Sequence, residues 1–219
     1  YPLSRVPCVL ARGKNYMSDI TAAAPSRLRE IAPTINAVSS YLKSSPDGAS
    51  ELLLDFTELF LSRAPDELLV HRSTKDLASM TRGAFRFLKQ SRPYRVDVAV
   101  ANADEDEEEW EAPVTVIRTN VSERPFIIDS IREYLALKGL AVERMVYPML
   151  DVDRDDNGRV TAMRVPTDSG STESVVHCEV ERIGDSDRLD ELRLDLSASL
   201  QDVVKATDDF LPMLSALDR

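Results

Sequence analysis

The sequence predicts an α+β protein, in which a helical N-terminal segment precedes a mainly antiparallel sheet with helices packed on one of its faces. Three observations carry this prediction. Apolar residues recur at helical spacing from Pro25 to about Ser91. Apolar and polar residues then alternate at 94–100, as in a strand with one buried face, and a strand–turn–helix–strand pattern occupies 113–152.

Three parts are expected along the chain. Residues 1–24 lack sustained periodicity and are expected to form a poorly ordered tail, residues 25–92 form the helical segment, and residues 93–219 form the α+β domain. Because Tyr1 is not an initiator residue, Met17 could be the natural start of the chain.

The helical segment should contain at least three helices. The first begins near Pro25 and could be split at Pro33, since proline removes a helical hydrogen bond. A turn cluster at 44–48 separates it from a helix around 52–60, which Ala64-Pro65 would close. Another helix should follow the capping signal Ser73-Thr74-Lys75-Asp76.

The α+β domain should open with the strand at 94–100. After the strand–turn–helix–strand unit, whose second strand is expected at 142–152, Asp155-Asp156-Asn157-Gly158 predicts a hairpin turn. A strand at 175–181 should bury Val176, Cys178 and Val180. A long helix begins near Asp187, and Pro212 is expected to bend or end it.

The turn inside the strand–turn–helix–strand unit is the candidate binding site. Ser122 is expected to cap the following helix, and Gly139 to end it in the left-handed conformation. The free N–H groups of a helix N-terminus favour a carboxylate, and Arg118 and Arg124 could add charge-assisted bonds. The alternative is an ordinary capped turn with Arg124 in solvent. The possible effector-binding residues are Asn120, Val121, Ser122, Glu123, Arg124, Pro125 and Phe126.

Composition excludes several classes of protein. A net charge of −11 argues against nucleic acid as a partner. No apolar run is long enough to cross a membrane and no signal peptide is recognisable, so a cytoplasmic location is expected. Cys8 and Cys178 cannot form a disulfide framework. The acidic block 104–109 is expected to be a solvated loop.

No catalytic or metal-binding motif is recognised. The seven glycines are scattered, so no glycine-rich phosphate cradle exists. Neither His71 nor His177 lies in a nucleophile-elbow context. His177 and Cys178 should point to opposite sides of a strand, with the cysteine inward and the histidine outward, and so could not share a metal ion.

Other polar and aromatic groups have ordinary structural interpretations. Asp153, Asp155, Asn157 and Gly158 fit the start of a calcium loop, but Arg164 replaces the acidic ligand at its end, so a hairpin turn is the better interpretation. The pairs Asp151 with Asp153 and Glu179 with Glu181 are expected on solvated strand faces, not as acid–base pairs. Trp110 and Phe126 are expected in the core, with ligand contact as the alternative.

The candidate turn resembles that of the ACT domain, a small βαββαβ ferredoxin-like module with which metabolic enzymes sense amino acids and pair subunits. Arg124-Pro125 and Lys138-Gly139-Leu140 match the ACT pattern at the two ends of the helix. Phe126 stands where that pattern has a glycine, which lets a ligand approach the backbone.

A longer resemblance, from about Ser50 to Leu217, is to the N-terminal region of the large bacterial NAD-dependent glutamate dehydrogenases, in which Pro-Phe is the usual helix entrance. It rests on separated pieces in the right order: Ser73-Thr74-Lys75-Asp76-Leu77, Glu109-Trp110-Glu111-Ala112-Pro113, Arg124-Pro125-Phe126-Ile127-Ile128-Asp129-Ser130, Val146-Tyr147-Pro148-Met149-Leu150 with Arg154-Asp155 and Gly158, Glu173-Ser174 with His177, and Asp208-Asp209-Phe210-Leu211-Pro212-Met213.

This resemblance implies a non-catalytic regulatory and assembly region. The parent enzyme would deaminate L-glutamate to 2-oxoglutarate, with NAD bound in a later, catalytic part; here no catalytic, cofactor-binding or metal-binding residue is expected. Implied partners are the remainder of the enzyme, further copies in a homo-oligomer and an amino-acid effector, but neither nucleic acid nor membrane. The alternative is a free-standing ACT-type amino-acid sensor or dimerisation module.

Overall fold

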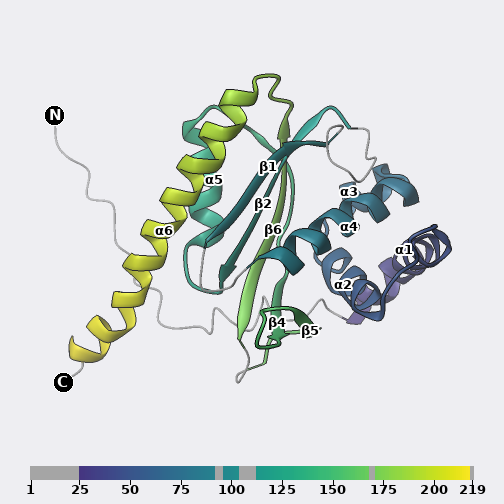
Figure 1. Cartoon of the computed structure of the whole chain (residues 1–219), viewed down its shortest axis with the longest axis horizontal. Helices are drawn as coiled ribbons and strands as arrows, with labels where there is room; N and C mark the ends of the chain where they lie inside the picture. The colour runs from purple at the N-terminus through teal and green to yellow at the C-terminus, as the bar shows by residue number, and fades with distance from the viewer. Residues whose placement is uncertain (1–24, 92–95, 104–111, 168–170, 218–219) are drawn as a thin grey trace.

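The computed structural model describes residues 25–91, 96–103, 112–167 and 171–217. They form three layers, with a central sheet between helices α1–α4 on one side and α5 and α6 on the other (Figure 1). Helices therefore cover both faces of the sheet, and the expectation of helices on one face is wrong. The helices are α1 Pro25–Ser44, α2 Glu51–Leu61, α3 Asp66–His71, α4 Thr74–Gln90, α5 Ile127–Leu137 and α6 Ser186–Leu217.

The strands form a sheet whose ladders are all antiparallel in the described residues. Its order is β1-β2-β6-β4-β5, and β3 pairs with β6 beside β4. The α+β class with a mainly antiparallel sheet is thus confirmed. The strands are β1 Asp97–Asn102, β2 Val114–Ser122, β3 Val142–Val146, β4 Met149–Arg154, β5 Val160–Arg164 and β6 Thr172–Glu181.

The position of β1 distinguishes this sheet from a simple βαββαβ unit. β1 precedes the β2–α5–β3 unit in the chain, and it lies beside β2 at the edge of the sheet. The side chains Val96, Val98 and Val100 pack into the same apolar cluster as α5 and α6. The edge of the sheet beside β2 is therefore formed by β1, which comes before the β2–α5–β3 unit in the sequence.

Two of the described helices begin at a capping serine, of which Ser73 was predicted. Ser50 accepts a hydrogen bond from the backbone N–H of Leu53 at the start of α2, and Ser73 does the same for Asp76 at the start of α4. In contrast, Pro33 lies inside α1 without splitting it. Burial of Ile31 and Ile35 on either side of the proline stabilises the continuous helix against the lost hydrogen bond.

The predicted extent of the strand at 142–152 is wrong, and of the two outcomes expected at Pro212 the end of the helix is wrong. The strand expected at 142–152 is divided into β3 and β4, with Tyr147 and Pro148 between them. Proline at this point cannot donate to a strand ladder. At the C-terminal end, α6 continues past Pro212 to Leu217 and projects beyond the sheet (Figure 1).

The two faces of the sheet pack against two separate apolar clusters. Val116 of β2 and Val175 of β6 pack with α1–α4, and we call this side the charged face because it also buries Arg118, Glu173 and Glu179. The opposite side packs against α5 and α6 and is called the apolar face. Its sheet and helix residues include Ile117, Val121, Val176, Cys178, Val180, Ile131, Leu135, Leu196 and Leu200.

Candidate functional site

The predicted turn connects the end of β2 to the start of α5. Ser122 is the last residue of β2, opposite Glu173 of β6, and does not cap the helix. The N-cap residue is Phe126, whose side chain makes no capping bond. The prediction of Ser122 as cap is therefore wrong, because the strand ladder continues to this residue and the helix starts five residues later, at Ile127. Gly139 ends α5 with φ of 72°, as predicted.

Phe126 has an unusual backbone conformation. Its φ is 75°, which places it in the left-handed region that favours glycine. A side chain there costs ~1–2 kcal/mol. The glycine of the general ACT pattern would fit this position without that cost. The ring is 58% exposed, so the expectation of a core residue is wrong, whereas its neighbour Ile127 is buried in the cluster of the apolar face.

Arg124 connects the turn to α6. Its guanidinium donates to the carboxylate of Asp208 at 2.6 Å and to the backbone carbonyl of Val204 at 3.1 Å, and it also bonds to the carbonyl of Ser122 at 3.2 Å. The Arg124 side chain is 17% exposed, whereas that of Asp208 is 64% exposed. The alternative of Arg124 standing free in solvent is therefore wrong.

Glu123 provides a carboxyl group with unusual acidity at the same turn. Burial raises its pKa from 4.5 to about 7, against the opposing effects of a hydrogen bond with Ser174 and of the Arg124 charge. Its backbone N–H donates to the carbonyl of Thr172, which holds the turn against β6. The turn thus offers a carboxyl that titrates near neutral pH beside an arginine.

The predicted residues do not all face one site. Asn120 is buried on the charged face and donates to Glu173 at 2.6 Å, and Val121 packs in the apolar cluster. The accessible residues follow Val121: Pro125 and Phe126 are exposed, and Ser122, Glu123 and Arg124 are half-buried. Since the α6 partners of Arg124 lie about 80 residues further along the chain, no local sequence signal indicated them.

In the described residues, the charged face buries two carboxylates, of which Glu173 is the first. Glu173 accepts two hydrogen bonds from Arg154, at 2.9 and 2.8 Å, and the same arginine donates to the carbonyl of Leu88 in α4. This arginine therefore connects the sheet to the helical layer through charge-assisted bonds.

Glu179 is the second buried carboxylate of the charged face. Arg72, just before α4, donates to it at 2.7 Å, Arg144 of β3 at 3.3 Å, and His177 lies 3.6 Å away. Burial raises the pKa of Glu179, but these neighbours outweigh it and bring the pKa below its ordinary value. The predicted solvated face is wrong for Glu179, although Glu181 is exposed.

His177 and Cys178 do point to opposite faces, as predicted, but His177 is not outward in solvent. Its ring packs edge-on against Phe60 of α2, with centroids 6.0 Å apart. Burial lowers the pKa of His177 and raises that of the Cys178 thiol to about 12. The outward prediction fails because α1–α4 cover the face that an isolated sheet would leave in water.

The calcium-like segment is a hairpin, as predicted. Gly158 has φ of 77°, and the carboxylate of Asp155 accepts from the N–H groups of Asn157 and Arg159. Arg164 pairs with Asp153 at 2.6 Å. Asp151, expected in solvent, is instead buried, where Thr167 and Thr172 donate to it.

Some predictions concern residues that the structure does not describe. The tail 1–24, the acidic block 104–109 and Trp110 lie outside the described residues. Within the described ranges, no helix is both long and apolar enough to span a membrane. In the same ranges, no group of three or more His, Cys, Asp or Glu side chains could hold a metal ion.

Comparison with known proteins identifies the family. Residues 56–196 match the family described as glutamate dehydrogenase, ACT1 domain. The NAD-specific glutamate dehydrogenase of Halomonas elongata is 32% identical over 161 residues, and that of Pseudomonas aeruginosa is 27% identical over the same length. Each match covers 72% of this chain but 10% of the relative, so the chain spans about a tenth of their length.

No solved structure gives a significant match to the chain. The matched residues 56–196 include α3–α5, all six strands and the candidate turn, and they confirm the resemblance to the large glutamate dehydrogenases. The chain therefore belongs to the family of glutamate dehydrogenase ACT1 domains.

Proposed function

We propose that this chain is a non-catalytic regulatory and assembly region in the N-terminal part of a large NAD-specific glutamate dehydrogenase. In this proposal the complete enzyme oxidatively deaminates L-glutamate to 2-oxoglutarate with NAD, and the cofactor is bound elsewhere in the polypeptide. The small share of the relatives that the chain spans supports this division of labour.

The contact between Arg124 and α6 is the observation that carries the regulatory part of the proposal. The guanidinium holds the turn to Val204 and Asp208 of α6. Because Asp208 is largely exposed, a carboxylate ligand could replace it at Arg124 with little loss of packing. Binding would then release one attachment of α6.

The other end of α5 is also attached to α6. Lys138 donates to Asp195 at 2.8 Å and to Glu191 at 3.3 Å. Since α6 also buries Leu196 and Leu200 against the sheet, its first half is held more firmly than the part near Asp208. A ligand at Arg124 would therefore alter the projecting end of α6 and leave its packed half in place.

The ligand that suits this turn is an α-amino acid. Its carboxylate would pair with Arg124, and its ammonium group with Glu123, whose carboxyl is charged above a pH of about 7. The exposed ring of Phe126 is available to contact an apolar side chain.

Assembly is the second part of the proposal. β1 forms the outer edge of the sheet among the described strands, and the half of its backbone groups that does not bond to β2 points outward. Apart from Asp97, its side chains are uncharged. A second copy of the chain, or another segment of the parent enzyme, could add a strand here.

Thermal unfolding of the 219-residue chain with each of the twenty amino acids, 2-oxoglutarate and NAD tests the regulatory proposal. A ligand at a hundred times its dissociation constant stabilises the fold by ~2.7 kcal/mol, which raises the Tm by roughly 5–10 °C. We expect at least one amino acid to raise the Tm of the wild-type chain by this amount. The same amino acid should not raise the Tm of Arg124→Ala.

The matched control is Arg132→Ala, because Arg132 is an exposed arginine on α5 outside the turn. It should keep the full shift. Stabilisation by no amino acid, or an equal shift in wild type and Arg124→Ala, would contradict the proposal. Oxidation of glutamate by the 219-residue chain in the presence of NAD would contradict the non-catalytic assignment.

A further inference from the structure

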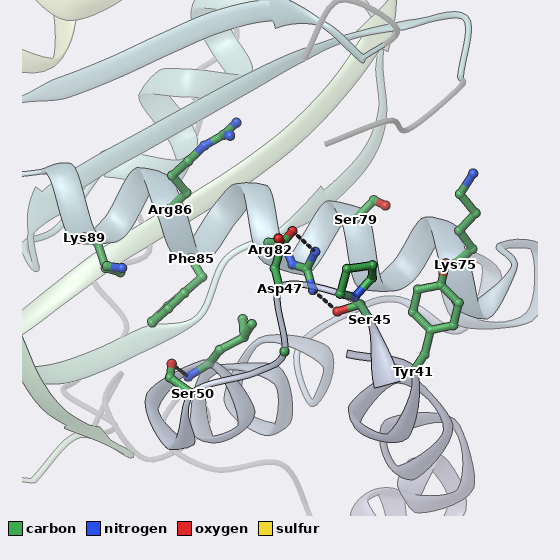
Figure 2. A pocket seen from close by; sticks show the side chains of 13 residues that line it. Tyr41, Ser45, Asp47, Ser50, Lys75, Ser79, Arg82, Phe85, Arg86 and Lys89 are labelled. Carbon is green, nitrogen blue, oxygen red and sulfur yellow. Dashed lines mark hydrogen bonds and ion pairs between the residues drawn. The ribbon is translucent and has the colours of Figure 1, made fainter. Parts of the chain in front are cut away.

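A second potential site lies on the helical layer, on the opposite side of the sheet from the turn. It is a cavity of about 650 Å³ between α4 and the connection from α1 to α2. This volume is within the range of ~300–1,000 Å³ typical of small-molecule sites. Figure 2 shows its lining, with Arg82 and Phe85 of α4 directed toward the α1–α2 connection.

The lining of this cavity is cationic. Lys75, Arg82, Arg86 and Lys89 line it from α4, at the spacing of one helix face, and Asp47 is the single carboxylate among the described lining residues. The chain as a whole carries a net charge of −11, whereas the residues that line this cavity carry a net positive charge. Its field therefore favours an anionic ligand.

Arg82 is positioned by the opposite wall. It donates to the hydroxyl of Ser45 at 2.7 Å, and its guanidinium lies 3.6 Å from the Asp47 carboxylate. The Asp47 side chain is 86% exposed, so it can move into solvent without loss of buried contacts. The arginine is thus held in place beside a carboxylate that a stronger anion can displace.

Other parts of the lining add to this preference. Ser50 caps the N-terminus of α2 at the edge of the cavity, and the positive end of that helix dipole points toward it. Lys89 lies over the ring of Phe85, with its Nζ 5.4 Å from the centroid. Tyr41, on α1, provides an aromatic ring that is partly exposed.

We infer that this cavity binds a small polyanion, with its phosphate or carboxylate groups between Arg82, Lys89 and the N-terminus of α2. The aromatic ring of Tyr41 is available to any planar part of the ligand. This site is separate from the proposed amino-acid site, because it is built from α1, α2 and α4 and shares no residue with the turn.

Calorimetric titration of the full chain at low ionic strength tests the inference. The probes are pyrophosphate and ATP for phosphate, citrate for polycarboxylate, and adenosine as a neutral molecule. We expect at least one anion to bind and adenosine not to bind. Binding of pyrophosphate and ATP alone identifies a phosphate site, and binding of citrate alone identifies a polycarboxylate site.

Charge variants at the exposed rim give the decisive result. Lys89→Ala should weaken binding about tenfold, through loss of a charge-assisted bond. Asp47→Asn should tighten it, because the competing carboxylate is removed. Lys43→Ala is the matched control, since Lys43 is exposed on α1 but does not line the cavity, and should leave affinity unchanged. No binding of any anion, or equal affinity in Lys89→Ala, Asp47→Asn and wild type, overturns the inference.

Discussion

Both faces of the sheet pack against apolar side chains of their helices, but the charged face is also held to its helices by buried ion pairs. On the apolar face, Ile117, Val176 and Cys178 meet the buried side chains of α5 and α6. Such packing is non-directional and its strength follows the apolar area removed from water. On the charged face, Glu173 and Glu179 are fully buried beside Arg154, which bonds to α4, and Arg72, which lies two residues before α4.

This difference indicates different roles for the two helical layers. Buried ion pairs contribute little net stability, because desolvation offsets their attraction, but they are geometrically selective. Arg154 binds Glu173 and the end of α4 at the same time. We therefore expect the charged face to fix where the helical layer sits, and the apolar face to provide more of the stability of the sheet.

The largest effect should follow from breaking the Glu173 pair. Glu173→Gln removes the charge that balances Arg154 in a buried site and should lower the free energy of unfolding by ~3–5 kcal/mol. Chemical denaturation measures it. Replacing both residues, as Glu173→Leu with Arg154→Met, should recover most of the loss. Glu181→Gln, on the same strand and face but exposed, is the control and should change little.

The double variant decides between the two roles. If it is as unstable as Glu173→Gln, the charged face contributes net stability and the contrast with the apolar face is wrong. If it is stable but its α4 amides exchange faster with solvent, the ion pair fixes position, as we expect.

The next largest effect concerns Glu123, at the margin of the apolar face. The unfolded chain releases this proton near pH 4.5 but the folded chain only near pH 7, so the group makes stability fall as the pH rises between these values. Glu123→Gln cannot titrate. Relative to wild type, its free energy of unfolding should rise by about 2–3 kcal/mol from pH 4.5 to 7.5. If the free energies of unfolding of wild type and Glu123→Gln changed equally with pH, the raised pKa of Glu123 would be contradicted.

A smaller effect is expected at Gly83, where α4 meets the charged face. Replacing a mid-helix glycine by alanine usually stabilises a helix by about 1 kcal/mol. Here the new methyl group would overlap the guanidinium of Arg118, so Gly83→Ala should instead destabilise by ~1–3 kcal/mol. Thermal unfolding measures the sign. Ser79→Ala, on the same helix, is the control, and stabilisation by Gly83→Ala would show that Arg118 is free to move.

Local patterns predicted most of the elements because these depend on nearby residues. Ser73 caps α4, Gly139 ends α5 and Gly158 forms a hairpin turn, each for a reason contained within a few residues. Burial of the charged face was not predictable in this way. Alternation in β6 assigned Glu179 to the side opposite Cys178, but only the packing of α1–α4 decides that this side is also buried.

The candidate turn was located correctly as a junction of strand and helix, but its contacts were not predicted. Arg124 is recognisable in sequence, whereas Asp208 is one acidic residue among many on α6. The φ of Phe126 could have been inferred from the glycine that the ACT pattern has there. The exposure of the Phe126 ring could not have been inferred, because an aromatic residue that precedes an apolar helix is ordinarily buried in the core.

In the proposed regulation, Arg124 couples the turn to the projecting part of α6. Amide hydrogen exchange of wild type, Arg124→Ala and the control Arg132→Ala tests it directly. We predict exchange roughly tenfold faster near Val204 and Asp208 in Arg124→Ala alone, with no change around Leu196. Equal exchange along α6 in all three proteins would contradict the coupling.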